Sequence, residues 1–258
     1  MPDPATRTTI DTDRARRLVR QAAETSRLLG VNFVPCYRTG ESDTTPEQVM
    51  PATDTPTRRD PAQVQHRLDE IRDRYQRDAP HKAFVTAHTK IVFGDGDPCA
   101  RLMFIGEAPG AEADRVGIPF VGRAGQLLNK MIEAMGLSRQ SVYIANVLKT
   151  RPPNNATPTI AESLLCAPYL YEQIQVIQPE VIVTLGLPAA RIILDSTDTM
   201  GRLRGRWGIF VDPADREVPV MPTYHPAYLL RSYTKDNREK VWSDLQQAME
   251  RLGLPVEA

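Results

Sequence analysis

The chain has 258 residues, of which 41% are hydrophobic, enough for one substantial α/β core plus an appendage but short for two full domains. Its 32 basic and 32 acidic residues cancel, which excludes a binding mode that depends on a global cationic field, so contacts with nucleic acid must come from local basic residues. Three cysteines, Cys36, Cys99 and Cys166, stand far apart without a CxxC pair, which indicates reduced thiols in a cytoplasmic protein rather than a disulfide framework.

Residues 1–62 are expected to lie outside the folded domain, which is predicted at 63–258. Apolar residues at helical spacing between residues 11 and 30 predict a helix within 1–36. The stretch 37–62 is rich in Thr, Pro, Asp and Glu, which predicts a flexible linker. The first thirty residues have no apolar signal region, and no later run reaches the ~20 apolar residues of a membrane span, so no membrane partner is expected.

Beyond residue 60 the pattern is that of an alternating α/β domain. An amphipathic helix is predicted at 61–77, with Val64, Leu68, Ile71 and Tyr75 on one face. Short apolar runs predict strands, and the segments between and after them predict helices. The strands are expected at 101–106, 142–147, 181–186 and 218–225, and the helices at 123–135, 160–177, 189–194 and 236–252. The alternation predicts a three-layer αβα sandwich around a mostly parallel, roughly four-stranded central sheet.

Polar or glycine-rich segments follow three of the predicted strands. The first strand ends in GEAPG at 106–110, the second at Asn146 and the last at His225. Ligands of open α/β sheets bind beyond the carboxyl ends of the strands. The three segments are therefore expected to meet in one cleft.

Four motifs in this order resemble the family 4 uracil-DNA glycosylases, the iron–sulfur type, over a motif-bearing core at about 92–252. They are GEAPG (106–110), PFVGRAGQLL (119–128), IANVLKTRPP (144–153) and TYHPAYLLR (223–231). The resemblance implies a uracil-DNA glycosylase-like fold and a monofunctional hydrolase of base-excision repair. Such an enzyme flips deoxyuridine out of single- or double-stranded DNA and hydrolyses its N-glycosidic bond to leave an abasic site. We expect it to act as a monomer.

The resemblance assigns the central roles to three residues. Phe120 stacks on the extruded base, and its alternative role is core packing. Asn146 reads N3–H and O4 of uracil with its amide, and its alternative role is that of a capping residue. His225 donates a hydrogen bond to O2 as the uracil anion departs, where an isolated histidine would more often be structural.

Three residues of the GEAPG motif are expected to line the uracil site. Some branches of the superfamily carry a water-activating aspartate at the position of Ala108, which has no base to offer. Glu107 is the nearest carboxylate, and it either positions the water or holds the turn. Gly110 occupies the position of a tyrosine that excludes the thymine methyl group in other branches, so strict rejection of thymine does not follow from the sequence.

The remaining candidates are contacts with DNA. Leu229, in a loop expected to be exposed, is the candidate wedge for the vacated stack, with burial against the last helix as the alternative. Basic residues near the strand ends are candidates for phosphate contacts, with plain solvated surface as the alternative. These are Arg202, Arg204, Arg206, Arg231 and Lys149, with Arg151 beside them.

The family's cofactor is where the sequence departs from the resemblance. Family 4 members carry four cysteines that hold a [4Fe–4S] cluster, and three of those positions are Ala79, Lys82 and Thr150 here. Cys166 alone is retained, and one thiolate cannot hold a cluster that needs four. We therefore predict no cofactor and no metal, and expect the N-terminal helices to replace the cluster's structural tie by apolar packing.

Two further functions remain open at this stage. Ala108 and Gly110 suggest a broader glycosylase that also accepts hypoxanthine, xanthine or mismatched uracil. The lost cluster suggests a non-catalytic DNA-binding relative, against which the intact Asn146 and His225 argue.

Overall fold

The computed structural model of the protein describes residues 59–85 and 87–256. The helix expected at 11–30 and most of the linker expected at 37–62 lie outside the described residues. Helix α2 (Pro61–Asp78) begins within the end of that predicted linker. Its start is fixed locally, because the Asp60 side chain accepts a hydrogen bond from the Ala62 amide and Pro61 occupies the first helical turn.

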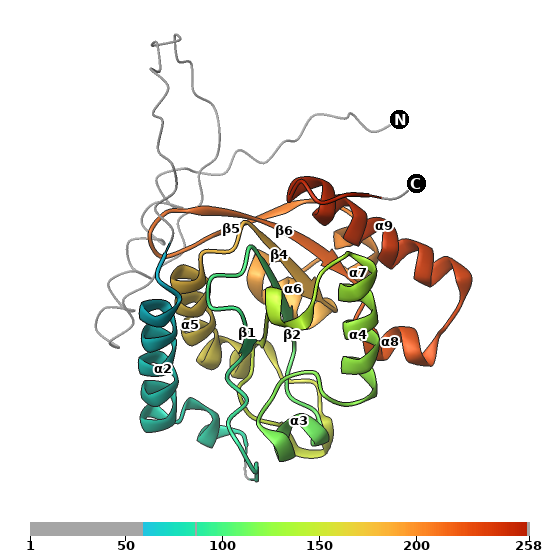
Figure 1. The fold of residues 1–258 in the computed structure, drawn as a ribbon. Helices are drawn as coiled ribbons and strands as arrows, with labels where there is room; N and C mark the ends of the chain where they lie inside the picture. The colour runs from blue at the N-terminus through green and yellow to red at the C-terminus, as the bar shows by residue number, and fades with distance from the viewer. Residues whose placement is uncertain (1–58, 86, 257–258) are drawn as a thin grey trace, which may run out of the picture. The chain divides into compact units, whose positions relative to one another are not determined.

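In the described part of the chain, six strands form one sheet in the order β1-β3-β2-β4-β6-β5 (Figure 1). Neighbouring strands β3 (Tyr143–Asn146), β2 (Leu102–Gly106), β4 (Val181–Leu185) and β6 (Glu217–Thr223) run parallel. The edge strands β1 (Asp95–Gly96) and β5 (Gly208–Val211) are antiparallel to their neighbours. The mostly parallel sheet is confirmed, whereas the two short edge strands were not predicted.

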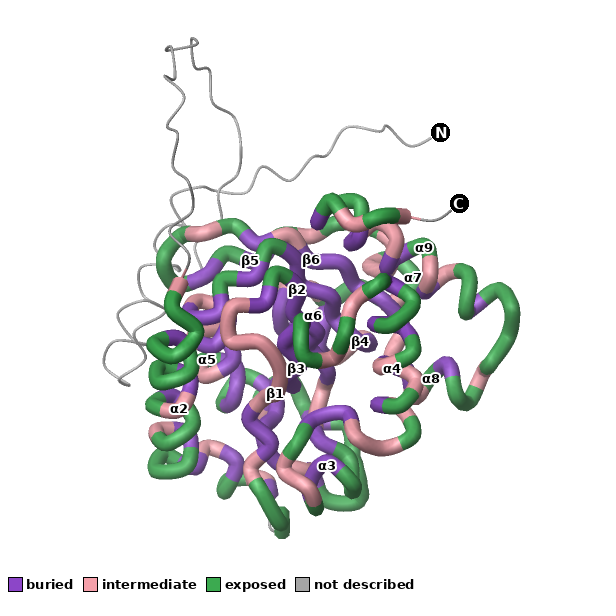
Figure 2. Tube along the Cα trace, in the orientation of Figure 1, coloured by how far each residue is buried: buried purple, intermediate pink, exposed green. Residues whose placement is uncertain are grey.

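Helices cover both faces of this sheet, which makes the three layers expected from the sequence. Alternate residues of a strand face opposite sides, and in β2 Met103 and Ile105 lie in one core cluster while Leu102 and Phe104 lie in the other. The first cluster includes residues of α2, α5 and α6, and the second includes residues of α4, α8 and α9. The central strands β2, β3 and β4 are accordingly buried along their length, while the outer faces of the helices are exposed (Figure 2).

The longer helices fall close to their predicted bounds. These are α4 (Arg123–Ala134), α5 (Ile160–Ile177), α6 (Leu187–Leu194) and α9 (Lys235–Arg251). Helix α5 begins with a capping box between Thr159 and Glu162. None of the helices in the described ranges has the length and apolar character needed to cross a bilayer.

Short helical segments were missed because each has only one or two turns. They are α3 (Ala111–Val116), α7 (Met200–Leu203) and α8 (Pro226–Arg231), with 3₁₀ turns η1 (Pro80–Ala83), η2 (Arg139–Ser141) and η3 (Pro153–Asn155). The expectation of an exposed loop after His225 is therefore wrong. That segment is α8, whose N-cap is His225 itself.

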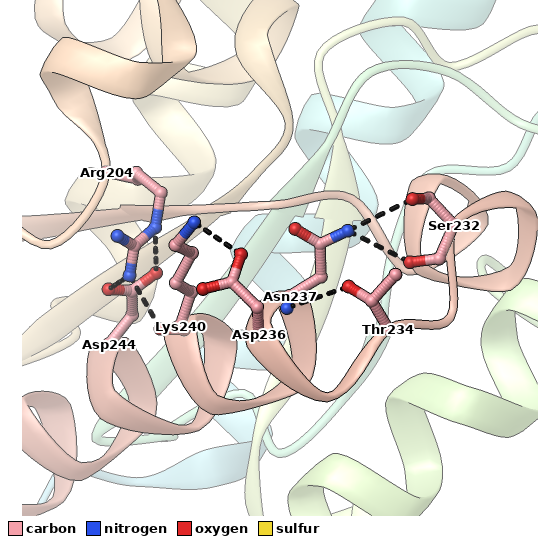
Figure 3. A network of polar contacts seen from close by, with 7 residues as sticks. All are labelled: Arg204, Ser232, Thr234, Asp236, Asn237, Lys240 and Asp244. Carbon is pink, nitrogen blue, oxygen red and sulfur yellow. Dashed lines mark hydrogen bonds and ion pairs between the residues drawn. The ribbon is translucent and has the colours of Figure 1, made fainter.

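A polar network attaches α9 to the sheet and to the end of α8 (Figure 3). The buried Asp244 carboxylate accepts hydrogen bonds from the Arg204 guanidinium at 2.5 Å and from the Thr223 hydroxyl at 2.7 Å. In the first turn of α9, the Asn237 side-chain amide donates to the carbonyl and the hydroxyl of Ser232. Both ends of the segment that contains His225 are thus anchored to α9.

Asp244→Ala should lower the free energy of unfolding by about 3–5 kcal/mol, because it leaves the largely buried Arg204 charge without its partner. Urea denaturation would measure the loss. Asp236→Ala is the matched control on the same helix, since it breaks an exposed pair with Lys240 and should cause only a small part of that loss. Equal losses in the two variants would show that the buried ion pair contributes no more to the free energy of unfolding than the exposed one.

Candidate active site

The three segments expected to form a cleft do follow neighbouring ends of the parallel strands. Gly106 ends β2 and is the register partner of Asn146, which ends β3. His225 comes two residues after Thr223, the end of β6, and Thr223 is the register partner of Leu185 on β4. The candidate site therefore spans the carboxyl edge of the central strands.

Phe120 and Asn146 meet at Gly106. A Cβ atom added to Gly106 would overlap the Asn146 Oδ1 and would stand 2.5 Å from the Phe120 Cζ. No side chain fits between the ring and the amide at this point, so glycine is required for their close approach. The aromatic face and the polar edge therefore lie against one spot at the end of β2.

His225 lies close to the same aromatic ring. The centroids of the Phe120 and His225 rings are 5.6 Å apart, and the ring planes are tilted by 32°. Gly186, at the end of β4, lets the histidine pack closely, since a Cβ there would stand 3.0 Å from the His225 Cβ. Phe120 is thus the common neighbour of Asn146 and His225.

The backbone that carries Phe120 is strained and externally held. Phe120 has φ of +53°, in the left-handed region that is costly for a residue with a bulky side chain. Arg139 donates hydrogen bonds to the carbonyls of Pro119 at 2.6 Å and Phe120 at 3.3 Å, and it is paired with Asp95 at 3.0 Å. A Cβ at Gly125 would collide with the Phe120 carbonyl. Sequence reasoning missed Arg139, because it acts through main-chain carbonyls and belongs to no motif.

The Asn146 side chain is buried, with a carbonyl oxygen that is unpaired within the described part of the chain. Asn146 is 1% exposed, and its Oδ1 has no hydrogen-bond partner among the described residues. A buried acceptor without a partner costs about 1–3 kcal/mol, so its retention calls for a compensating group. An N–H donor held against Phe120 would supply that group.

His225 has a defined protonation state. Its Nδ1 accepts a hydrogen bond from the Ala227 amide at 3.0 Å, so that nitrogen carries no proton. Burial, together with the nearby Arg231 charge, lowers the pKa of His225 to about 4. The ring is therefore neutral near pH 7 and carries its proton on Nε2, which is free to donate.

Glu107 supplies the one carboxylate of the GEAPG turn. Glu107 is half-buried; burial raises the pKa of its carboxyl group, and a hydrogen bond with Thr157 opposes that rise. Ala108 is partly buried against the first core cluster. Gly110 is exposed, precedes α3, and has open space where a Cβ would project.

Two of the basic residues expected to contact DNA have structural roles instead. Lys149 is fully buried and donates hydrogen bonds to the Asn146 carbonyl and to Gln173. Arg204 is engaged by the buried Asp244. The assignment of these two residues to phosphate contacts is wrong, because neither reaches the surface with a free charge.

The other basic candidates are more accessible. Arg202, Arg206 and Arg231 are exposed, although Arg202 forms an exposed ion pair with Asp198. Arg151 is half-buried and donates to the Asn155 side chain. The exposed three remain as candidates for phosphate contacts.

Leu229, the candidate wedge, is 3% exposed and lies in the second core cluster. Its neighbours Tyr228 and Leu230 are 37% and 38% exposed on the surface of α8. The structure therefore supports the alternative role of Leu229, which is burial, and contradicts its assignment as a wedge.

The positions of the family's cluster ligands hold no set of thiolates. The Cys166 Sγ lies 3.7 Å from the Tyr75 hydroxyl, and His81 and Tyr169 both contact the Tyr75 ring. Cys99 lies apart, with its Sγ 3.8 Å from the Arg59 carbonyl. Within the described ranges, no group of three or more His, Cys, Asp or Glu side chains is arranged to hold a metal. These residues do not fit a four-cysteine cluster.

Comparison with known proteins identifies the family. The model of the uracil DNA glycosylase superfamily matches residues 93–246, and the chain belongs to that superfamily. A type-4 uracil-DNA glycosylase of Thermotoga maritima is 42% identical over 163 residues, which cover 62% of this chain and 82% of the relative. One of Archaeoglobus fulgidus is 43% identical over 175 residues (64% and 83%), and a type-5 uracil-DNA glycosylase of Thermus thermophilus is 34% identical over 119 residues (41% and 52%).

The state of His225 can be checked by nitrogen NMR. Long-range ¹H–¹⁵N spectra near pH 7 should show a neutral ring with the proton on Nε2, because the Ala227 amide occupies Nδ1. The signal should stay unchanged as the pH falls until it approaches about 4. A ring that titrates near its ordinary value of 6.5, or one protonated on Nδ1, would contradict the structure.

Proposed function

We propose that Phe120, Asn146 and His225 form the uracil site of this chain, a uracil-DNA glycosylase that hydrolyses the N-glycosidic bond of deoxyuridine in DNA. The observation that carries the proposal is the contact of Phe120 with both polar residues at the carboxyl edge of the sheet. The similarity to type-4 uracil-DNA glycosylases, at about 42% identity, points to the same reaction. The product is an abasic site, the substrate of the next step of base-excision repair.

Uracil is recognised along one edge and over one face. The base stacks on Phe120, and its N3–H donates to the buried Asn146 Oδ1, whose lack of a protein partner supports this role. The Asn146 amide donates to O4 in turn. Cytosine has an acceptor at N3 and a donor at C4, so it would face two mismatched groups in the buried site.

His225 stabilises the charge that develops on the leaving base. As the C1′–N1 bond breaks, its electron pair moves onto the uracil ring, and the Nε2–H of neutral His225 donates to O2. Because the pKa of His225 is about 4, the ring is neutral near pH 7, and its single proton on Nε2 is available as a hydrogen-bond donor. The oxygen of a water molecule bonds to C1′ and loses a proton, and the departing base takes up a proton to become neutral uracil.

Glu107 is the residue that we assign to the attacking water. Partial burial raises the pKa of its carboxyl group, which makes the carboxylate a better proton acceptor than a solvated one. Ala108 and Gly110 then line the base pocket without contributing chemistry. Because they add no bulk, an assay should include duplexes with hypoxanthine and xanthine beside uracil.

The surface of α8 and nearby arginines form the proposed DNA contact. Arg202, Arg206 and Arg231 are exposed and available to phosphates. Leu230 and Tyr228, rather than Leu229, are exposed on α8 and available to enter the vacated stack. We propose that the protein acts as a monomer on single- or double-stranded DNA.

We further propose that the protein works without an iron–sulfur cluster in the cytoplasm. Ala79, Lys82 and Thr150 offer no thiolate, and the Cys166 sulfur lies beside the hydroxyl of Tyr75, whose ring packs against those of His81 and Tyr169. The packing of α2 against α5 through these rings replaces the structural link that a cluster would make. The folded domain is proposed to span 63–258. The free thiols of Cys99 and Cys166 are typical of a reducing compartment.

The wild-type protein should convert uracil in a labelled oligonucleotide into an alkali-sensitive site. His225→Ala should slow excision by about 10²- to 10³-fold, as expected when one donor to a developing negative charge is removed. His66→Ala, on the exposed face of α2, is the matched control and should keep the full rate. An unchanged rate in His225→Ala would remove this residue from the mechanism.

Iron and acid-labile sulfide should be measured on the same preparation, purified without oxygen. We expect neither in stoichiometric amount, together with full excision activity. Stoichiometric iron and sulfide would contradict the proposed cofactor-free enzyme, and the absence of excision would contradict the proposed activity.

The two adjacent leucines of α8 should respond in opposite ways. Leu229→Ala should lower the free energy of unfolding by about 2–5 kcal/mol, because it empties a buried position. Leu230→Ala should leave stability unchanged and slow excision from duplex DNA by about 10-fold or more, with a smaller effect on single strands. Urea denaturation and excision assays on both substrates would test the pair. Normal duplex excision by Leu230→Ala would reject it as the wedge.

A further inference from the structure

Lys149 is a fully buried cation directly beneath the proposed base-reading residue. It lies three residues after Asn146, and its ammonium donates to the Asn146 main-chain carbonyl at 2.7 Å. The same ammonium donates to the Gln173 Oε1 on α5 and lies 5.3 Å from the centroid of the Phe93 ring. Taking a lysine out of water is costly, so a position of this kind is kept only where the ammonium is well paired.

The partner of Lys149 is itself fixed in orientation. The Gln173 Nε2 donates to the Phe93 carbonyl at 3.1 Å and approaches the Tyr143 hydroxyl at 3.4 Å. With its nitrogen engaged on that side, the amide presents its oxygen to Lys149. A continuous chain of hydrogen bonds therefore runs from α5 through Gln173 and Lys149 to the end of β3.

The Asn146 side chain depends on its backbone for its position. Its Oδ1 accepts no hydrogen bond from the described residues, so no protein donor orients the amide through that oxygen before a base arrives. The strand ladder holds one side of this residue, where the Val147 amide donates to the Gly106 carbonyl at 3.0 Å. The Asn146 carbonyl points the other way, and Lys149 holds it.

We propose that Lys149 is a positioning residue, which fixes the Asn146 backbone so that the side-chain amide meets the edge of uracil. This inference rests on the proposed function, because it assumes that Asn146 reads the base. An error of about 1 Å in such a group can cost about 100-fold in rate, which is the scale of effect expected here.

The charge of Lys149 should make uracil affinity depend on pH, which allows its role to be tested. Burial lowers the pKa of Lys149 to about 7. The titratable groups packed around the network are Cys166 on α5, Tyr75 on α2 and Tyr143 on β3. Burial raises the pKa of all three, so each is neutral while the lysine titrates. Deprotonation would turn the charge-assisted bond to the Asn146 carbonyl into a weaker neutral one.

The test compares Lys149→Met with the wild type in three measurements. Inhibition by free uracil should weaken by about 10- to 100-fold, because the variant loses a charged hydrogen bond that supports the base-reading residue. Affinity for a duplex without uracil should not change. Uracil affinity of the wild type should also fall as the pH rises through about 7, and this dependence should vanish in Lys149→Met.

Two further variants keep the test decisive if Lys149→Met does not fold. Gln173→Leu frees the lysine without touching Asn146, and it should weaken uracil inhibition in the same direction. Cys166→Ala is the matched control, since it removes a buried side chain near Lys149 outside the hydrogen-bond chain, and it should leave inhibition unchanged. Unchanged inhibition in the first two variants, or an equal loss in Cys166→Ala, would overturn the proposal.

The test separates this inference from the proposed function. If the wild type excises no uracil, the function is wrong, and the ¹H–¹⁵N signals of the Asn146 side-chain amide still report on Lys149. Those signals should shift in Lys149→Met and Gln173→Leu and stay in place in Cys166→Ala. Signals that do not move in any variant would reject the positioning role independently of catalysis.

Discussion

Parallel pairing of β2, β3, β4 and β6 is the constraint on which the rest of the structure depends. It brings the carboxyl ends of four strands to one edge, so that residues 106, 146 and 225 become neighbours although long stretches of chain separate them. A slip of one residue between β2 and β3 would turn Asn146 to the opposite face of the sheet and take it from Gly106. Register, rather than any single contact, therefore sets the geometry of the site.

Each of the three proposed uracil-binding residues is supported by a basic residue bound to a main-chain carbonyl or a buried carboxylate. Arg139 holds the carbonyls around Phe120, and Lys149 holds that of Asn146. Arg204, through Asp244, ties Thr223 to α9 just before His225. Part of the basic content thus stabilises the site from inside, which fits a chain with no excess positive charge.

The sequence predicted the central strands and the longer helices because their apolar periodicity is strong. Helix α5 has its predicted bounds, and four motifs in order led to the correct superfamily. The short edge strands and α8 were missed, since two to six residues contain too little periodicity.

Whether an individual side chain is buried or exposed was harder to predict. Nothing in the pair Leu229-Leu230 tells which leucine faces the core, because that depends on how α8 lies on α4. Likewise, Lys149 and Arg204 look like surface cations in the sequence, and only the tertiary packing reveals the Gln173 and Asp244 that receive them. Roles that act through backbone carbonyls, such as that of Arg139, leave no motif to find.

The packed rings of Tyr75, His81 and Tyr169 have a consequence for how the protein matures. A packing contact made only of the protein's own side chains forms as soon as the polypeptide folds. In the proposed cofactor-free protein, this packing needs no delivered inorganic component, so the domain can fold fully in a cell that is short of iron.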